Sequence, residues 1–287
     1  MITKKKDCQL ECESDPNLFI CAEVLKRTGY YHGVEKKLCE KCCDKLIKEF
    51  CEFAVNYHES SAREKTRRVV SIKPDKNQKK PTEITIIRYT DGYVSKIIEK
   101  KCLQYLKSIK IEKNIINVPK PINKKRCFLT LYEQILEGTN RTKAKYIFLA
   151  EQDVLYHPSR FYFIPSFDDV LYYQNNLFYC TEKGYLVPRP PLLSMLVTSR
   201  ELLIDHLVNR IKAIKGGLIP KLGSLGYNDM KLKESEIRYY WAEYPSVDIR
   251  HNLNFTGNRE SKDKDFYIDC VPFWGHYKKL RKKLRLK

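Results

Sequence analysis

Residues 145–161 read KYIFLAEQDVLYHPSRF, and the predicted organisation of the chain follows from this stretch. Residues 146–150 are an unbroken run of apolar, strand-forming side chains, which is typical of a strand buried on both faces in a parallel sheet. The run ends at Glu151-Gln152-Asp153. Open α/β sheets bind ligands at the carboxyl ends of their strands, and two carboxylates there can hold a hard cation beside phosphate oxygens. The stretch therefore predicts a central strand that ends in a ligand site.

The composition indicates a globular protein. The chain has 287 residues, of which 43% are hydrophobic, enough for one large α/β domain and a small appendage. Its beginning lacks the apolar segment of a secretion signal, and no run of about 18 apolar residues predicts a membrane span. We therefore expect an intracellular, cytoplasmic protein.

The formal net charge of +19 has two interpretations. A surface this basic attracts polyanions such as nucleic acid, anionic lipid or phosphorylated substrates. An excess of lysine over arginine, with abundant Ile, Asn and Tyr, is also what an AT-rich coding sequence produces without selection for binding. Charge alone leaves this choice open.

Cysteines are concentrated near the beginning of the chain, where Cys8 and Cys12 form one closely spaced pair and Cys39 and Cys42 another. Two such thiolate pairs can supply the ligands of a tetrahedral, structural Zn²⁺ site. Three further side chains could replace one of the four: Cys21, Cys43 and His32. The alternative is that these cysteines are small buried hydrophobic residues of a helical appendage.

The pattern of elements predicts four segments. Residues 1–58 form the cysteine-rich module, 59–82 a basic linker, 83–260 the main domain and 261–287 a basic tail. Strands that alternate with helices in the main domain are typical of right-handed βαβ units. We therefore expect the α/β class, with a mainly parallel central sheet and a small cysteine-rich, zinc-binding appendage.

Individual elements follow from hydrophobic periodicity and turn signals. Strands are predicted at residues 84–89, 114–118, 146–150, 193–197 and 237–244, and a hairpin at 177–187. Helices are predicted at residues 95–108, 125–138, 168–173 and 198–215. Gly138 is expected to stop the second helix, and Thr198 to open the last one in a capping box with Glu201. The basic tail is expected to form a helix over the sheet or on a polyanion.

Three motifs together resemble those of GT-A type nucleotide-sugar glycosyltransferases. They are LxxYEQILxG at residues 129–138, AEQDVLYHPS at 150–159 and SVDIRHNxNFTG at 246–257. More narrowly, the pattern resembles the intracellular branch of phages and bacteria, which is similar to the proposed base-J glucosyltransferases. The resemblance covers residues 83–259 and implies a Rossmann-like GT-A fold that transfers a hexose from a UDP-sugar.

The resemblance implies a metal site. Glu151 and Asp153 stand where GT-A enzymes carry an Asp-x-Asp element that binds Mn²⁺ or Mg²⁺ and the diphosphate and ribose of the donor. Asp153 is the expected metal ligand, whereas Glu151 is longer than the usual aspartate and is not assumed to act as one. His251 stands where a late histidine completes the metal shell, with His157 and His276 as alternatives.

The same resemblance assigns other parts of the donor site. Thr90 and Asp91, after the first strand, match the region that receives the base and ribose. Arg250 and Arg259 could clamp phosphate through bidentate hydrogen bonds.

The transfer also needs a general base if the reaction inverts the sugar. Asp229 is the first candidate, because related enzymes carry an acidic residue before a helix in this region, and Glu234 and Glu236 are the alternatives. A divalent ion would lower the barrier by neutralising the departing diphosphate.

Several functions remain open. The leading one is a glycosyltransferase whose acceptor is a hydroxymethylated pyrimidine flipped out of DNA, because the chain is basic and resembles base-modifying relatives. A polysaccharide, lipid or protein acceptor is the alternative within that class. A zinc-containing nucleic-acid-binding protein with a degenerate transferase domain, or a nucleotidyltransferase, would belong to other classes.

Overall fold

The computed structural model describes most of the predicted main domain and tail. The described residues are 83–120, 124–186, 192–220, 223–226, 232, 235–251, 254 and 267–286. The predicted zinc ligands, Cys8, Cys12, Cys39 and Cys42, and the basic linker lie outside the described residues. No helix within these ranges is long and apolar enough to cross a membrane.

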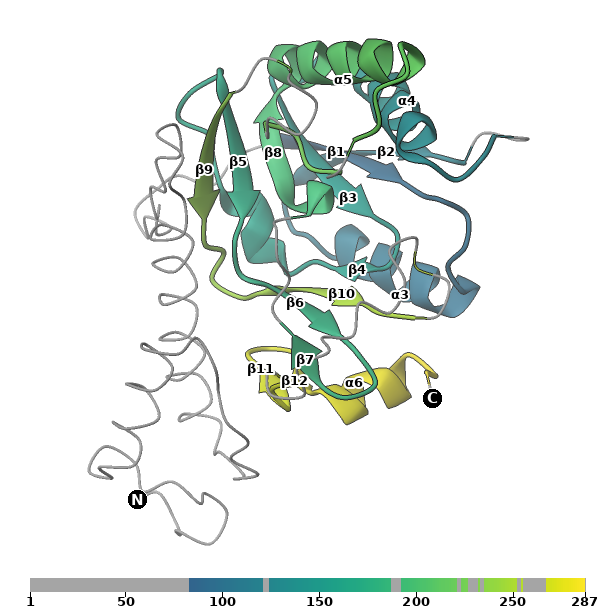
Figure 1. Ribbon diagram of the computed structural model, residues 1–287. Helices are drawn as coiled ribbons and strands as arrows, with labels where there is room; N and C mark the ends of the chain where they lie inside the picture. Colours follow the sequence, from purple (N-terminus) through teal and green to yellow (C-terminus); the bar gives the residue numbers. More distant parts are fainter. Residues whose placement is uncertain are drawn as a thin grey trace, which may run out of the picture.

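A six-stranded sheet forms the centre of the described fold (Figure 1). Its order is β2 (Glu112–Val118), β1 (Glu83–Tyr89), β3 (Tyr146–Glu151), β8 (Leu196–Ser199), β5 (Val170–Gln174) and β9 (Glu236–Tyr240). Within this sheet, β8 runs antiparallel to both neighbours and the other strands share one direction. The expected α/β class with a mainly parallel central sheet is confirmed.

Two helices cover opposite faces of this sheet, as the strand order requires. α3 (Lys96–Lys107) connects β1 to β2, and α4 (Phe128–Asn140) leads from β2 back across β1 to β3. Right-handed crossovers in opposite directions place their helices on opposite faces. Figure 1 shows this arrangement, with α4 beside α5 (Arg200–Lys215) on one face and α3 on the other. The carboxyl ends of β1 and β3 therefore lie side by side at the position in the strand order where the crossovers reverse their direction.

A second sheet lies against α3 and the end of the chain. Its order is β4 (Val154–Leu155), β10 (Ser246–Ile249), β6 (Leu177–Cys180) and β7 (Tyr185–Leu186). The hairpin of β11 (Cys270–Val271) and β12 (Gly275–His276), followed by α6 (Tyr277–Lys283), packs on it. The tail therefore forms a helix that packs over a sheet, which was one of the two positions predicted for it. Only the pair of β6 and β7 was predicted, because strands this short carry little periodicity.

Three predicted elements differ from the structure. Residues 168–173 were predicted as a helix, but 170–174 form β5, whose side chains are all buried between β8 and β9. Burial on both faces and the aromatic and β-branched side chains favour a strand there. Residues 193–197 divide into a 3-10 turn (Leu193–Met195) and the start of β8. The predicted last strand of the sheet, 237–244, ends at Tyr240.

Two predicted helix boundaries were also wrong. Ser199, one residue after Thr198, caps α5: its hydroxyl accepts a hydrogen bond from the Leu202 amide at 3.3 Å. The hydroxyl of Thr198 instead donates to the carbonyl of Val170, which ties β8 to β5.

Gly138 lies inside α4 instead of ending it, because the helix continues to Asn140. A Cβ atom on residue 138 would lie only 2.7 Å from Cγ2 of Ile87 and of Val118. Glycine therefore allows α4 to approach β1 and β2 closely, and this approach carries the polar side chains of α4 to the ends of those strands.

Candidate functional site

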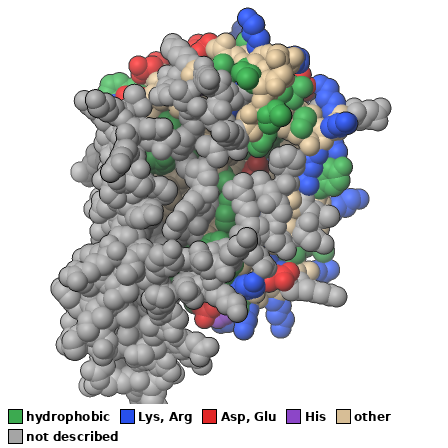
Figure 2. Space-filling view, viewed as in Figure 1, with side chains coloured by type: hydrophobic (Ala, Val, Ile, Leu, Met, Phe, Trp, Pro, Cys, Tyr) green, Lys and Arg blue, Asp and Glu red, His purple; other side chains and the backbone are tan. Residues whose placement is uncertain are grey.

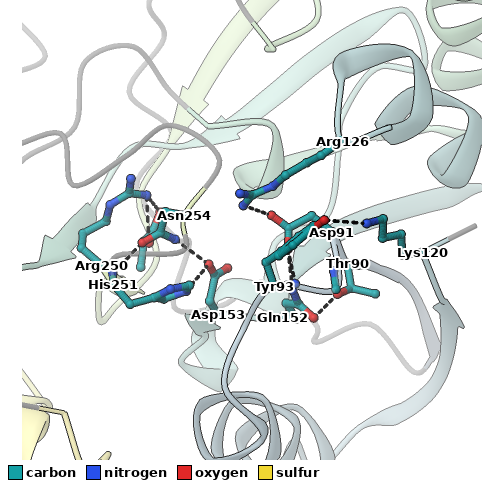
Figure 3. A network of polar contacts seen from close by, with 12 residues as sticks. Thr90, Asp91, Tyr93, Lys120, Arg126, Gln152, Asp153, Arg250, His251 and Asn254 are labelled. Carbon is teal, nitrogen blue, oxygen red and sulfur yellow. Dashed lines mark hydrogen bonds and ion pairs between the residues drawn. The ribbon is translucent and has the colours of Figure 1, made fainter. Parts of the chain in front are cut away.

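The ends of β1 and β3 place two groups of polar side chains at one edge of the central sheet (Figure 3). Tyr89 and Glu151 are opposite each other in the register of these strands, so the residues that follow them are neighbours. Gln152 points towards Thr90, whereas Asp153 points away towards His251 (Figure 3). Gln152 and Asp153 form the turn between β3 and β4, and their side chains leave it in different directions, so one short segment serves both groups.

Asp153 and His251 form the first group. Nε2 of His251 lies 3.3 Å from Oδ2 of Asp153, and both side chains are largely buried. The second sheet brings them together, because the amide of Ile249 in β10 donates to the carbonyl of Asp153 at 2.9 Å. Asn254 supports both residues: its Nδ2 donates to Oδ2 of Asp153 at 2.8 Å, and its Oδ1 accepts from the His251 amide at 2.6 Å.

The two atoms fit a divalent cation. Such ions bind oxygen and nitrogen at about 2.0–2.2 Å, so adjacent ligands of one ion lie about 3 Å apart. Oδ2 of Asp153 and Nε2 of His251 are separated by 3.3 Å. In the described ranges, no group of three or more His, Cys, Asp or Glu side chains could hold a metal ion. An ion at this pair would therefore take its other ligands from water or from a bound substrate, as Mg²⁺ commonly does.

The alternative histidines have structural positions. His157 caps the 3-10 helix Pro158–Tyr162, where Nδ1 accepts from the Ser159 amide at 3.1 Å, and burial lowers its pKa to about 4. His276 caps α6 by accepting from the Lys278 amide at 3.2 Å. Neither ring is within ion-pair distance of Asp153, and His251 is the histidine that the structure brings to it.

Glu151 lies in a concentration of negative charge. Burial, and then the charges of Asp153 and Asp248, raise the pKa of Glu151 to about 8. The pKa of Asp248 rises to about 7, mainly through burial, although Arg250 acts in the opposite direction. Asp248 is compensated by Arg250 at 3.3 Å, whereas a cation bound at Asp153 would lower the pKa of the neighbouring Glu151.

Arg250 is turned into the protein. Its Nη1 lies 3.3 Å from Oδ2 of Asp248, and its guanidinium group lies 4.7 Å from the centre of the Tyr179 ring. To contact a phosphate, the guanidinium group would have to leave Asp248, so the phosphate clamp by Arg250 stays a prediction. Three further predicted site residues lie outside the described part of the chain: Asp229, Glu234 and Arg259.

The second group surrounds Asp91. Arg126 forms an ion pair with Oδ2 of Asp91, and Nε2 of Gln152 donates to Oδ1 at 3.1 Å. Oε1 of Gln152 accepts a hydrogen bond from the hydroxyl of Thr90. The side chain of Gln152 is buried, and both ends of its amide hold the segment after β1 to the segment after β3.

Gln134 supports the same segment from α4. This side chain is 2% exposed, and its Nε2 donates to the carbonyl of Thr90 at 2.8 Å and of Pro119 at 2.9 Å. These bonds join the ends of β1 and β2. The position of Thr90 therefore depends on how closely α4 packs on the sheet.

Tyr93 adds an accessible aromatic ring beside Asp91. It is 43% exposed, with Nζ of Lys120 4.3 Å and Cζ of Arg126 4.8 Å from the ring centre. An aromatic ring bordered by two cations can contact a planar heterocycle and an anionic group at once. The edge of the sheet thus offers a cation pair on one side and an aromatic, basic surface on the other.

Sequence reasoning missed four of these residues. Gln152 and Gln134 stand inside two of the three motifs, but only Glu151 and Asp153, the charged neighbours of Gln152, were predicted to act in the site. A polar amide within an otherwise apolar helix stripe was a usable signal for Gln134. Arg126 and Tyr93 lie in or next to loops without periodicity, and no sequence signal distinguishes them from other exposed residues.

Comparisons with known proteins give limited information. A scan against protein-family models found no match, and a search of curated proteins found none either. A search of solved structures found a similarity to a mutant of Drosophila beta-1,4-galactosyltransferase 7 in complex with manganese, UDP-Gal and xylobiose. The sequences are 10% identical, the match covers 63% of this chain and 76% of that chain, and the TM-score is 0.35. A similarity this weak assigns neither a family nor an activity, so the site is interpreted from its own residues.

Proposed function

We propose that this chain is a metal-dependent glycosyltransferase that moves a hexose from a UDP-sugar to an acceptor hydroxyl. The approach of Asp153 and His251 to 3.3 Å, next to the group around Asp91, carries this proposal. One group offers ligands for a cation and the other offers polar and aromatic contacts for a nucleoside. A nucleoside diphosphate is a substrate that needs both at neighbouring positions.

Each group has a distinct role in this proposal. Asp153 and His251 would hold Mn²⁺ or Mg²⁺, whose chemistry is to offset the charge of a departing diphosphate. Asp91 would accept hydrogen bonds from the ribose hydroxyls, and Gln152 would keep its carboxylate in place. Glu151 is longer than the aspartate of an Asp-x-Asp element, and burial raises its pKa to about 8 in the metal-free protein, so Asp153 is the proposed metal ligand of the pair.

The general base and the zinc module stay predictions. Asp229 and Glu234, the candidates for the base, and the four cysteines are assigned only by the sequence.

The proposed acceptor is a 5-hydroxymethyl-pyrimidine in DNA. The net charge of +19 supports a polyanionic acceptor, and a base must leave the duplex before an enzyme can reach its hydroxyl. Polysaccharide, lipid and protein acceptors are the alternatives, and a transfer assay with a panel of acceptors separates them.

The test is UDP binding with and without Mn²⁺, followed by hydrolysis and transfer with a panel of UDP-sugars. We expect Mn²⁺ to strengthen UDP binding, and Asp153→Asn to weaken it at least about tenfold, or about 1.4 kcal/mol. Asp168→Asn is the matched control, because Asp168 pairs with Lys145 at the opposite end of β3. Unchanged UDP binding and turnover in Asp153→Asn, or consumption of nucleoside triphosphates instead of UDP-sugars, would show that the proposal is wrong.

A further inference from the structure

α6 presents an uninterrupted row of cations to the solvent. Lys278, Lys279, Lys282 and Lys283 are exposed, and Arg285, also exposed, follows the C-cap residue Leu284. Residues 270–286 contain no acidic side chain. Within the described ranges, no carboxylate forms an ion pair with any of the four lysines. We propose that this row, with the adjoining edge of α3, is a docking surface for the phosphate backbone of a nucleic acid.

The opposite face of α6 fixes the helix in the fold. Tyr277, Leu280 and Leu284 are buried in the hydrophobic cluster of the second sheet. Arg281 is also buried, and its Nη1 donates to the carbonyl of Arg250 at 3.2 Å. A cationic row on a fixed helix loses less conformational entropy on binding than the same residues on a mobile tail would lose.

α3 extends the basic surface. Nζ of Lys283 donates to the hydroxyl of Tyr105 at 3.3 Å, so the edges of α6 and α3 are in contact. Lys101 lies one helical turn before Tyr105, on the same edge of α3, and Lys100 is exposed beside it. Figure 2 shows Lys and Arg side chains, with a few Asp and Glu side chains among them, at the lower end of the described part, where Figure 1 places α6.

The two helices that carry this surface are connected to the candidate donor site. Arg281 of α6 bonds to the backbone of Arg250, and the next residue is His251. α3 begins a few residues after Asp91. A polymer lying on α6 and α3 would therefore pass near the candidate donor site. The inference deepens the proposed function and rests on it for the DNA acceptor, whereas the binding surface itself can be measured without any sugar donor.

Two features favour a nucleic acid over an anionic membrane. Membrane-surface helices insert their apolar face between lipids, but the apolar face of α6 is buried in this protein. The four lysines of α6, from residue 278 to residue 283, span about 7.5 Å at about 1.5 Å per residue. Duplex DNA carries about four negative charges over that length, at about one per 1.7 Å. The density of lysines matches a polymer of regularly spaced phosphates.

The test measures binding of the full-length protein to a short unmodified DNA duplex over a range of salt concentrations. The variant is Lys278→Gln, Lys279→Gln and Lys282→Gln, which leaves the Lys283 contact intact. The matched control is Lys143→Gln, Lys212→Gln and Lys215→Gln, which removes the same charge from exposed positions elsewhere on the fold. Each lost phosphate contact should reduce the slope of log Kd against log salt by about 0.9.

We expect the slope of the α6 variant to be about 2.7 smaller than that of the wild type, and the control to keep the wild-type slope. Raising the salt from about 50 mM to about 200 mM would then weaken wild-type binding by a factor about 40 times larger than for the variant. Lysine-to-arginine changes at the same three positions should preserve binding, which separates a lost charge from a misfolded helix.

Equal slopes in the wild type and the α6 variant would overturn the inference. So would a variant that keeps DNA binding and loses binding to phosphatidylserine vesicles, because the partner would then be a membrane. The failure of the proposed function looks different: a wild-type protein with the expected slopes and no UDP-sugar turnover would contradict the transferase and support the nucleic-acid surface.

Discussion

Replacing Gln134 by methionine would remove two hydrogen bonds and leave the shape of the side chain almost unchanged. The lost bonds run from Nε2 to the carbonyls of Thr90 and Pro119, at 2.8 and 2.9 Å. A net hydrogen bond is worth about 1 kcal/mol, and more where the remaining partner cannot reach water. Thr90 is partly exposed and Pro119 is exposed, so we expect water to reach these carbonyls. We therefore expect the free energy of unfolding to fall by about 2 kcal/mol, measured by urea denaturation.

The same change should affect nucleotide binding. Without Gln134, Gln152 and Arg126 are the described side chains that still hold Thr90 and Asp91. The nucleotide would then have to order the segment after β1 when it binds. If that ordering costs about 1.4 kcal/mol, UDP affinity in the presence of Mn²⁺ falls about tenfold. Isothermal titration calorimetry measures this change directly.

Gln174→Met is the matched control. Gln174 is a buried glutamine at the end of β5 whose Nε2 donates to the carbonyl of Asn176 at 3.1 Å and to its side-chain oxygen at 2.9 Å, and whose Oε1 accepts from the hydroxyl of Ser246 at 2.8 Å. Because three bonds are lost, this variant should lose at least as much stability as Gln134→Met, yet bind UDP as the wild type does. Equal losses of UDP affinity in both variants would refute the positioning role of Gln134, because affinity would then follow global stability.

Two further substitutions test packing and pH dependence. Gly138→Ala should lower the free energy of unfolding by about 1–2 kcal/mol, measured by urea denaturation. The new methyl group would overpack against Ile87 and Val118, and this cost exceeds the gain in helix propensity of about 1 kcal/mol. An unchanged or higher stability would mean that α4 shifts away from the sheet freely. Burial lowers the pKa of His157 to about 4, against about 6.5 in the unfolded chain, so its contribution to stability is complete above about pH 6.5 and is lost as the pH falls towards 4. His157→Asn keeps a capping acceptor. Between about pH 6.5 and about pH 4, the variant should lose about 1–2 kcal/mol less unfolding free energy than the wild type, allowing for the partial exposure of His157. A variant as acid-sensitive as the wild type would contradict this reasoning.

The first half of the described fold could be predicted from the sequence. β1, α3, β2, α4 and β3 are long enough for hydrophobic periodicity to distinguish strands from helices. β5 could not be predicted in the same way, because a run of four apolar residues followed by Gln174 fits a buried strand or a helix equally well, and its burial between β8 and β9 decided the outcome. The short strands of the second sheet depend in the same way on partners far along the chain.

For the candidate site, the sequence by itself determined the residue types. It placed carboxylates at the end of β3 and a histidine late in the chain, because a ligand site at a strand end follows from local pattern. Only the tertiary structure decided that β10 brings His251 to 3.3 Å from Asp153. It also decided that Gln152 faces Thr90 while its neighbour faces the histidine, and that α6 carries its lysines beside α3. These contacts join residues that are far apart in the sequence, and strand register and helix packing, which set their distances, are properties of the whole fold.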